Sequence, residues 1–356
     1  MVFLPVLLVS AMLAGPRNFD LGIVRGGGHG DDLPGMNTHA PMPTIALIGA
    51  PTDAGAGLRG ASLGPEALRV AGLVQALRQQ GLRVEDRGDL AGPINPQHPP
   101  REGCRHLQEV DIWVQLAADA VQECLAWGQL PVLMGGDHSV AIGSVAAVAS
   151  HCARQGRPLH VVWLDAHADC NTPASSPSGH LHGMPVACLL GQGPGALVRG
   201  LQRWLGTGSV LQPQQLSLLG VRSTDPGEDA WLRAVPLHCV RMAGDDGEGV
   251  LLALAYLLAR LDARTHVHLS LDLDVLDPQR APGVSTPVPG GLSAAQALAC
   301  MRLLAASGLV GSVDCVELNP ARDVRQQTAR LAVALLAQLC APRVQNTQSS
   351  AAVMNR

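Results

Sequence analysis

Lysine is absent from this sequence of 356 residues, and all 25 of its basic side chains are arginines. This absence excludes a Schiff-base lysine as nucleophile and the lysine that binds phosphate in a P-loop. Enzymes that depend on pyridoxal phosphate and ATPases of the Walker type are therefore excluded as functional classes.

Aromatic residues are also scarce, with two Phe, one Tyr and five Trp in the whole chain. Proteins that bind nucleic acid use basic stripes that pair with phosphates and, for single strands, aromatic side chains on which bases stack. The net charge here is −4 with histidines neutral, and no basic stripe is present. We therefore expect no nucleic-acid partner.

The cysteines form no recognisable framework. Nine of them are scattered between Cys104 and Cys340, and no pair has the C-x-x-C spacing. An odd count without such a framework is typical of free thiols in a reducing compartment, so we expect a cytoplasmic protein. Most of these cysteines are expected to be small buried apolar residues.

The beginning of the chain carries an apolar run from Val2 to Leu13 that is too short to span a membrane, so no membrane partner is expected. It also lacks the basic residues that begin a secretory signal peptide, because the first arginine is Arg17. The readings left open are a signal peptide, an appended and poorly ordered segment, and a start placed too far upstream, with Met36 or Met42 as the true start. We predict three parts, an N-terminal extension, one folded domain and a polar tail, at residues 1–42, 43–342 and 343–356.

From Thr44 onward, short apolar runs alternate with helical stretches. The run 45–49 ends at Gly and Pro, as expected of a buried strand. A helix is predicted from Pro65 to Leu77, because proline is tolerated in a first turn and leucines recur at helical spacing. Further strands are expected at 130–134, 160–164, 215–221, 266–273 and 309–318, and further helices at 107–127, from about 140, at 250–261, 293–306 and 327–339.

This alternation predicts an α/β fold, a single-domain three-layer sandwich with a mostly parallel sheet and helices on both faces. No internal repeat and no linker divides the core. In such a sheet, functional side chains gather at the carboxyl ends of the strands.

Acidic and histidine side chains follow or end four of the expected strands. They occur in Gly135-Gly136-Asp137-His138, in Asp165-Ala166-His167-Ala168-Asp169, as the pair Asp272 and Asp274, and as Glu317. Residues at i, i+2 and i+4 of an extended chain point to one side, so the members of each set are expected to converge, unless the loop after the strand bends Asp169. The spacing therefore predicts one polar site at this edge of the sheet.

Four clustered carboxylates would repel one another and would be costly to bury alone. Two divalent cations would offset this charge. Asp oxygens and His nitrogens without a thiolate suit manganese, with zinc, iron, cobalt and nickel as alternatives. Two such ions about 3.5–4 Å apart can bridge a water and lower its pKa toward neutrality. A single residue of this kind is usually a turn cap or a satisfied polar group, but the joint pattern favours metal binding.

These motifs, together with Ser139 and the segment Ser270-Leu271-Asp272-Leu273-Asp274-Val275-Leu276-Asp277-Pro278, resemble those of the ureohydrolase family, which includes the arginases. The similarity extends from about Ile45 to Leu339. It implies an arginase-like α/β fold with two Mn²⁺ per subunit. By this resemblance one ion would be held by His138, Asp165, Asp169 and Asp272, and the other by Asp165, His167, Asp272 and Asp274.

The resemblance also implies a reaction, the hydrolysis of the guanidinium group of L-arginine to L-ornithine and urea by a metal-bridging hydroxide. The choice of substrate rests on the loop 171–185, which is similar to the arginase loop that reads the amino-acid end of the substrate. Asn171 and Ser178 would bind the α-carboxylate with His180 beside them, and Asp225 would face the α-ammonium group. Residues that would contact or line the substrate site are His167, Asn171, Ser178, His180, Asp225, Thr286 and Glu317.

Three residues carry the chemistry in the implied mechanism. Glu317 would pair with the planar guanidinium and hold it in line for attack. Asp169 and the metals would stabilise the tetrahedral intermediate and receive the hydroxide's proton. His182 is the expected proton shuttle to the leaving amine, because histidine titrates near neutrality, and a loop-fixing hydrogen bond is its alternative role.

The chain departs from the family pattern in the substrate loops but not at a metal ligand. His180 stands where arginases usually have Asn, Ser223 replaces a common acid two residues before Asp225, and 323–326 lacks an Asn that relatives often carry. Another guanidino hydrolase, such as agmatinase or guanidinobutyrase, is the nearest alternative. A one-metal zinc deacetylase and a non-catalytic binding protein are more distant ones. Relatives form trimers or hexamers, so the resemblance implies a homo-oligomer.

Overall fold

A computed structural model of the chain describes residues 43–93, 98–206, 209–244 and 247–341. The expected extension at 1–42 and the expected tail at 343–356 lie outside these ranges. The described residues form an eight-stranded sheet in the order β2-β1-β3-β8-β7-β4-β5-β6, in which every strand pair is parallel. The strands are β1 (Ile45–Ala50), β2 (Val84–Asp89), β3 (Leu130–Gly135), β4 (Leu159–Leu164), β5 (Leu216–Val221), β6 (His238–Arg241), β7 (His266–Asp272) and β8 (Val310–Val316).

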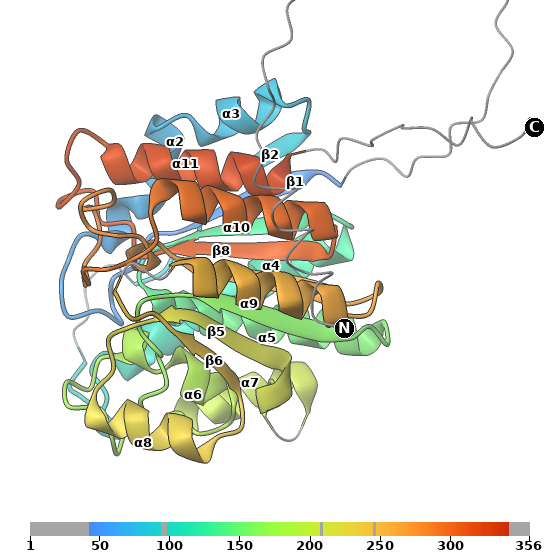
Figure 1. Ribbon diagram of the computed structural model, residues 1–356. Helices are drawn as coiled ribbons and strands as arrows, with labels where there is room; N and C mark the ends of the chain where they lie inside the picture. Colours follow the sequence, from blue (N-terminus) through green and yellow to red (C-terminus); the bar gives the residue numbers. More distant parts are fainter. Residues whose placement is uncertain (1–42, 94–97, 207–208, 245–246, 342–356) are drawn as a thin grey trace, which may run out of the picture. The chain divides into compact units, whose positions relative to one another are not determined.

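Helices cover both faces of the sheet, so the expected α/β sandwich is confirmed (Figure 1). One face is covered by α2 (Gly64–Val70), α3 (Leu73–Gln79), α9 (Gly247–Arg260), α10 (Ala294–Ser307) and α11 (Gln327–Cys340). The other face is covered by α4 (Leu107–Ala126), α5 (Ala141–Arg154), α6 (Pro185–Leu189) and α8 (Pro226–Ala234), with α7 (Gly195–Leu205) packed on α4 and α5. No helix within the described ranges is both long enough and apolar enough to cross a membrane.

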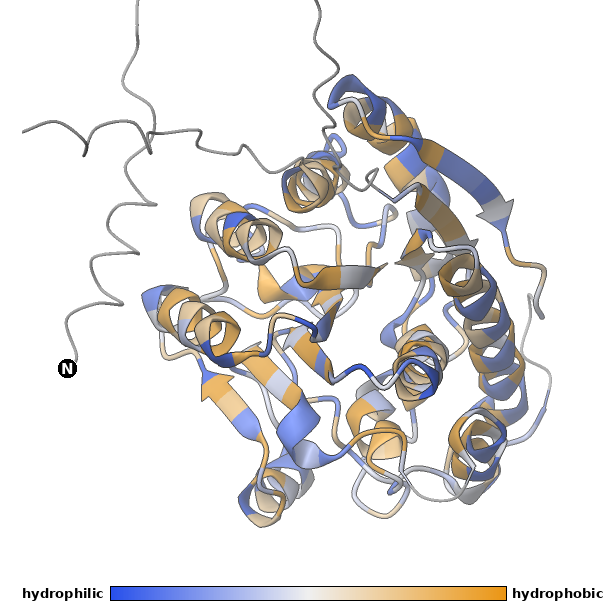
Figure 2. Ribbon diagram, turned by 90° about the vertical axis from the view of Figure 1, so that its right-hand side faces the viewer, coloured by the Kyte–Doolittle hydropathy of each residue, from blue (hydrophilic) through white to orange (hydrophobic). Residues whose placement is uncertain are grey.

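The central strands are buried on both faces, as expected for a parallel sheet covered by helices. All six residues of β4 and all six of β5 are buried, and Figure 2 shows the hydrophobic colour on strands of the interior, whereas the edge strand β2 is largely in the hydrophilic colour. The helix α5 is rich in small residues, which lets it approach α4 closely. A Cβ on Gly143 would lie 2.0 Å from the carbonyl oxygen of Val114, so glycine is required at this crossing.

Two expectations about the elements were wrong or incomplete. The single helix predicted at 65–77 is two helices, because Gly72 between α2 and α3 adopts a left-handed conformation with φ of 92°. The edge strands β2 and β6 were not predicted. The sequence of β2, VEDRGD, is largely polar and partly exposed, so it lacks the apolar run by which the inner strands were recognised.

Candidate metal centre and substrate cavity

The predicted site lies at the carboxyl edge of the four central strands, which are neighbours in the order β3-β8-β7-β4. His138 follows β3 in a short 3-10 turn, and Glu317 follows β8 directly. Asp272 ends β7, and Asp274 lies in the 3-10 turn Leu273–Val275 after it. The segment 165–169 follows β4. Strands far apart in the sequence therefore bring these side chains together.

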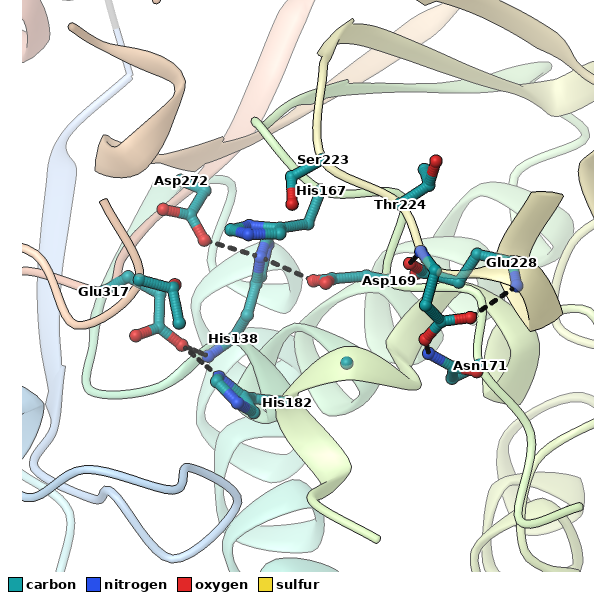
Figure 3. A pocket seen from close by; sticks show the side chains of 13 residues that line it. His138, His167, Asp169, Asn171, His182, Ser223, Thr224, Glu228, Asp272 and Glu317 are labelled. Carbon is teal, nitrogen blue, oxygen red and sulfur yellow. Dashed lines mark hydrogen bonds and ion pairs between the residues drawn. The ribbon is translucent and has the colours of Figure 1, made fainter. Parts of the chain in front are cut away.

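His138 stands between three carboxylates. Its Nδ1 lies 3.1 Å from Asp165 Oδ2, 3.0 Å from Asp169 Oδ2 and 3.2 Å from Asp272 Oδ2. Figure 3 shows Asp169 and Asp272 on opposite sides of this ring. Its other nitrogen, Nε2, lies 2.9 Å from the Ser270 hydroxyl, which holds the ring with Nδ1 toward the carboxylates.

His167 lies beside a second set of carboxylate oxygens. Its Nδ1 is 3.0 Å from Asp274 Oδ2 and 3.5 Å from Asp165 Oδ1. Two groups of possible metal ligands result, one of His138, Asp165 and Asp272 and one of Asp165, His167 and Asp274, with ligand atoms in each group within 4.8 Å of one another. Asp165 belongs to both groups, as expected of a carboxylate that bridges two cations.

The electrostatics of these groups favour a cation. Burial and the charge of Asp165 raise the pKa of Asp169 to about 7. Burial and the charges of Asp274 and Asp165 raise the pKa of Asp272 well above its ordinary value. The protein alone therefore cannot keep all these carboxylates ionised at neutral pH without cost. His138 Nδ1 is buried and faces three carboxylates without a well-aligned hydrogen bond to any of them, so the donor set fits divalent metal ions.

The route by which the segment 165–169 converges differs from the expectation. The strand β4 ends at Leu164, so no strand alternation continues through Asp169. Asp169 instead adopts a left-handed backbone conformation with φ of 50°, which few residues other than glycine take up. The loop, not the pleat of a strand, therefore turns this carboxylate toward His138.

A cavity of about 270 Å³ opens onto the metal ligands. Its lining residues are His138, His167, Asp169, Asn171, His182, Gly183, Ser223, Thr224, Asp225, Glu228, Asp272, Thr286 and Glu317. Asp165 and Asp274 lie deeper, at 0% and 1% exposure. Thr286 donates a hydrogen bond of 3.0 Å from its hydroxyl to Asp274 Oδ2, which links the cavity wall to the ligand set.

Glu317 is buried at one end of this cavity. Its Oε1 accepts a hydrogen bond of 2.9 Å from the backbone N–H of His138 and lies 3.1 Å from Nδ1 of His182. Its Oε2 is buried without a partner, and its backbone is left-handed with φ of 63°. Burial lowers the pKa of His182, but the hydrogen bond and charge of Glu317 raise it to about 9. The pair thus offers a free carboxylate oxygen beside a cationic ring.

Asn171, Asp225 and Glu228 line the cavity from another side. Asn171 donates a hydrogen bond of 2.6 Å to Asp225 Oδ2, and Asp225 Oδ1 accepts the backbone N–H groups of Gly227 and Glu228 at the start of α8. Burial raises the pKa of Glu228. Glu228 was missed as a site residue. Its signal was the Asp-x-x-Glu spacing of a capping box, which places an acid in the first turn of a helix beside Asp225.

Two predicted substrate residues do not line this cavity. The carbonyl of Ser178 accepts a hydrogen bond of 3.0 Å from Arg105 Nε, and its hydroxyl accepts one of 3.2 Å from the backbone N–H of His180. The His180 ring meets the His182 ring edge-on at 6.2 Å between centroids. Both residues therefore belong to a turn next to the cavity. Ser223, one of the departures from the family pattern, is among the lining residues.

Comparisons with known proteins agree on one family. The profile of the Arginase family matches residues 43–341. The chain is 41% identical to an arginase from Bacillus caldovelox over 301 residues, which are 84% of this chain and 98% of that protein. The native structure of an arginase from the same organism superposes with a TM-score of 0.76 at 38% identity, covering 85% of this chain and 100% of that one. A hypothetical agmatinase from Burkholderia thailandensis is less similar, at 27% identity, 84% coverage of each chain and a TM-score of 0.62.

Proposed function

The chain belongs to the arginase family, and from this premise we propose that it hydrolyses the guanidinium group of L-arginine to L-ornithine and urea. One observation carries the proposal. A single cavity joins two overlapping sets of metal ligands to a buried carboxylate, Glu317, whose Oε2 has no partner. A planar guanidinium is a group of the right charge and shape for that oxygen.

We propose two Mn²⁺ as the cofactor, since the ligand atoms are carboxylate oxygens and imidazole nitrogens without a thiolate. One ion would be held by His138, Asp165, Asp169 and Asp272, and the other by Asp165, His167, Asp272 and Asp274. When bound, such a pair of cations acts as a Lewis acid and lowers the pKa of the attacking water.

The protein's own residues bind and orient the substrate. Glu317 holds the guanidinium through its free oxygen, which supplies orientation for the attack. Asp225 and Glu228 supply negative charge for the α-ammonium group from the start of α8. For the α-carboxylate we propose Asn171, with Ser178 and His180 in the neighbouring turn, while Thr286 and His167 complete the wall near the metals.

Two residues move protons in this proposal. Asp169, which lines the cavity beside His138, takes up the proton of the attacking water. His182 lies beside Glu317, carries a proton at neutral pH, and has a side chain that is 20% exposed. It can therefore receive a proton from solvent and donate it to the leaving amine of ornithine.

We also propose a cytoplasmic homo-oligomer whose catalytic domain is the segment 43–342. All nine cysteines are free thiols, and eight of them are buried, which is consistent with a reducing compartment. The family profile ends at residue 341, one residue before the proposed boundary. The homo-oligomer rests on the family resemblance alone.

Urea release from Mn²⁺-loaded protein tests the function, with L-arginine and agmatine compared side by side. Release from arginine with little from agmatine is the expected result, since agmatine lacks the α-carboxylate. Release mainly from agmatine would retain the metal chemistry but overturn the substrate assignment, with His180 as the first residue to exchange. No release from either substrate by metal-loaded protein would contradict the proposal.

A further inference from the structure

Arg222 lies directly after β5, and its guanidinium packs against the turn that carries Asp274. It donates hydrogen bonds of 2.7 Å to the carbonyl of Asp274 and 2.8 Å to the carbonyl of Val288. Weaker contacts of 3.2 to 3.4 Å reach the carbonyls of Gly220, Val275, Leu276 and Pro289. One side chain therefore ties together the end of β5, the turn that carries Asp274 and the loop that carries Thr286.

The planar fork of arginine explains why this residue can do so. A guanidinium carries five N–H donors in a fixed plane, whereas an ammonium carries three on a flexible stem. The carbonyl oxygens around Arg222 come from three separate segments, and the N–H groups of one guanidinium point outward in different directions toward them. A lysine at this position could satisfy only part of the set.

The surroundings of the guanidinium leave little room for displacement. A Cβ on Gly291 would lie 2.6 Å from Arg222 Nη2 and 2.5 Å from the carbonyl carbon of Leu276. Glycine at this position therefore lets the backbone approach the guanidinium. The contact is part of a packed arrangement and not a loose surface interaction.

The two loops held by Arg222 meet at one carboxylate. Asp274 Oδ2 accepts the hydroxyl of Thr286 at 3.0 Å and lies 3.0 Å from His167 Nδ1. The backbone carbonyl of Asp274 is bound to Arg222, and the loop of Thr286 is bound to Arg222 through Val288. Asp274 belongs only to the second ligand group. Arg222 thus holds it directly at its backbone carbonyl and indirectly at its carboxylate, through the loop of Thr286.

We propose that Arg222 is a positioning residue for the second metal position, the one formed by Asp165, His167 and Asp274. It keeps Asp274 and Thr286 in place for a cation without contacting that cation. The first position, which contains His138, has no ligand whose backbone carbonyl Arg222 holds. This inference rests on the binuclear centre of the proposed function.

The test is calorimetric titration of metal-free protein with Mn²⁺, comparing the wild type with Arg222→Lys. This substitution keeps the positive charge, so a loss of Mn²⁺ affinity reports on the planar geometry of the guanidinium and not on its charge. We expect the second Mn²⁺ to bind about 10- to 100-fold more weakly, which is the usual effect of changing a residue that hydrogen-bonds to a metal ligand without contacting the metal. The first Mn²⁺ should bind as in the wild type, and excess Mn²⁺ should restore turnover.

Arg233→Lys is the matched control, because Arg233 lies exposed on α8. Gly291→Ala is a second variant that leaves the arginine in place but crowds both its Nη2 and the backbone of Leu276, and it should weaken binding of the same cation. The inference would be overturned if Arg222→Lys and Gly291→Ala both bound the first and the second Mn²⁺ with wild-type affinity. It would also be overturned if the affinities for the two ions fell equally. If the wild type itself bound no second Mn²⁺, the binuclear centre of the proposed function would fail instead.

Discussion

Individual residues at this site adopt conformations that local sequence alone disfavours. Asp169 and Glu317 both have left-handed backbones, with φ of 50° and 63°. Such conformations cost free energy for residues other than glycine and persist where the surrounding structure imposes them. Here each one turns a carboxylate into the cavity, so backbone strain occurs at two positions to which the proposed mechanism assigns a role.

In the proposed centre, metal binding is expected to depend strongly on Asp165, because it belongs to both groups of candidate ligands. We expect Asp165→Ala to bind little Mn²⁺ and to lose nearly all activity. Asp119→Ala removes a carboxylate that is 65% exposed and should retain both. Bound metal per chain, measured after removal of free ions, decides the question. Full occupancy in Asp165→Ala would contradict the bridging role.

A variant of His182 can distinguish proton transfer from metal binding in the proposed mechanism. We expect His182→Ala to retain its metal but to lower turnover about 10²- to 10⁴-fold, the usual contribution of a general acid or base. His151→Ala, on α5 away from the cavity, serves as the control. Unchanged turnover in metal-loaded His182→Ala would leave only the loop-fixing role.

At the scale of elements, the first turn of the helix α8 lines the cavity beside the candidate metal centre. Its N-cap, Asp225, accepts two backbone N–H groups and also meets Asn171. The same carboxylate therefore stabilises the helix and supplies charge to the cavity. Helix capping needs only an oxygen, whereas binding of an ammonium group needs the negative charge, so the two roles can be separated.

Asp225→Asn should keep the cap, because asparagine caps as well as aspartate, and should raise the KM for arginine. Asp225→Ala should raise the KM and also lower the free energy of unfolding by about 1 kcal/mol. Ser293→Ala, which removes the cap of α10, should show the stability loss alone. Denaturant unfolding and steady-state kinetics on the three variants check this. An unaltered KM in Asp225→Asn would remove Asp225 from substrate recognition.

At the scale of the whole molecule, the pair of His182 and Glu317 links stability to pH. Burial lowers the pKa of His182, but its pairing with Glu317 raises it from 6.5 to about 9. A raised folded-state pKa means that the folded protein binds this proton more tightly than the unfolded chain does. The stabilisation is fully present below about pH 6.5 and is lost as the pH rises through about 9.

We therefore expect the metal-free wild type to lose stability relative to metal-free His182→Ala as the pH rises from about 6 to 10. Denaturant unfolding of both proteins across that range measures the difference. A difference that stays constant with pH would show that Glu317 does not hold a proton on His182.

Much of the fold was predictable, because the inner strands and long helices have strong local signals. The prediction of a helix at 107–127 corresponds to α4 at Leu107–Ala126, and that at 327–339 corresponds to α11 at Gln327–Cys340. The edge strand β2 was missed because it is polar, and the break at Gly72 was missed because leucine spacing continues across it. Hydrophobic patterns in the sequence indicate burial. The strand β2 is instead a polar edge strand, and the break depends on the backbone conformation of Gly72.

The sequence by itself determined the chemistry of the site, since the types of donor atom and their places after buried strands can be read directly from it. Tertiary structure alone decided which donors meet. Glu317 reaches His182 across 135 positions of the chain, and Asn171 reaches Asp225 across 54. The order of the strands in the sheet creates these contacts. Contacts between segments that are distant in sequence also set the conformations of the loops. They account for the left-handed turn at Asp169, for the carbonyls that surround Arg222, and for the placement of Ser178 and His180 next to the cavity.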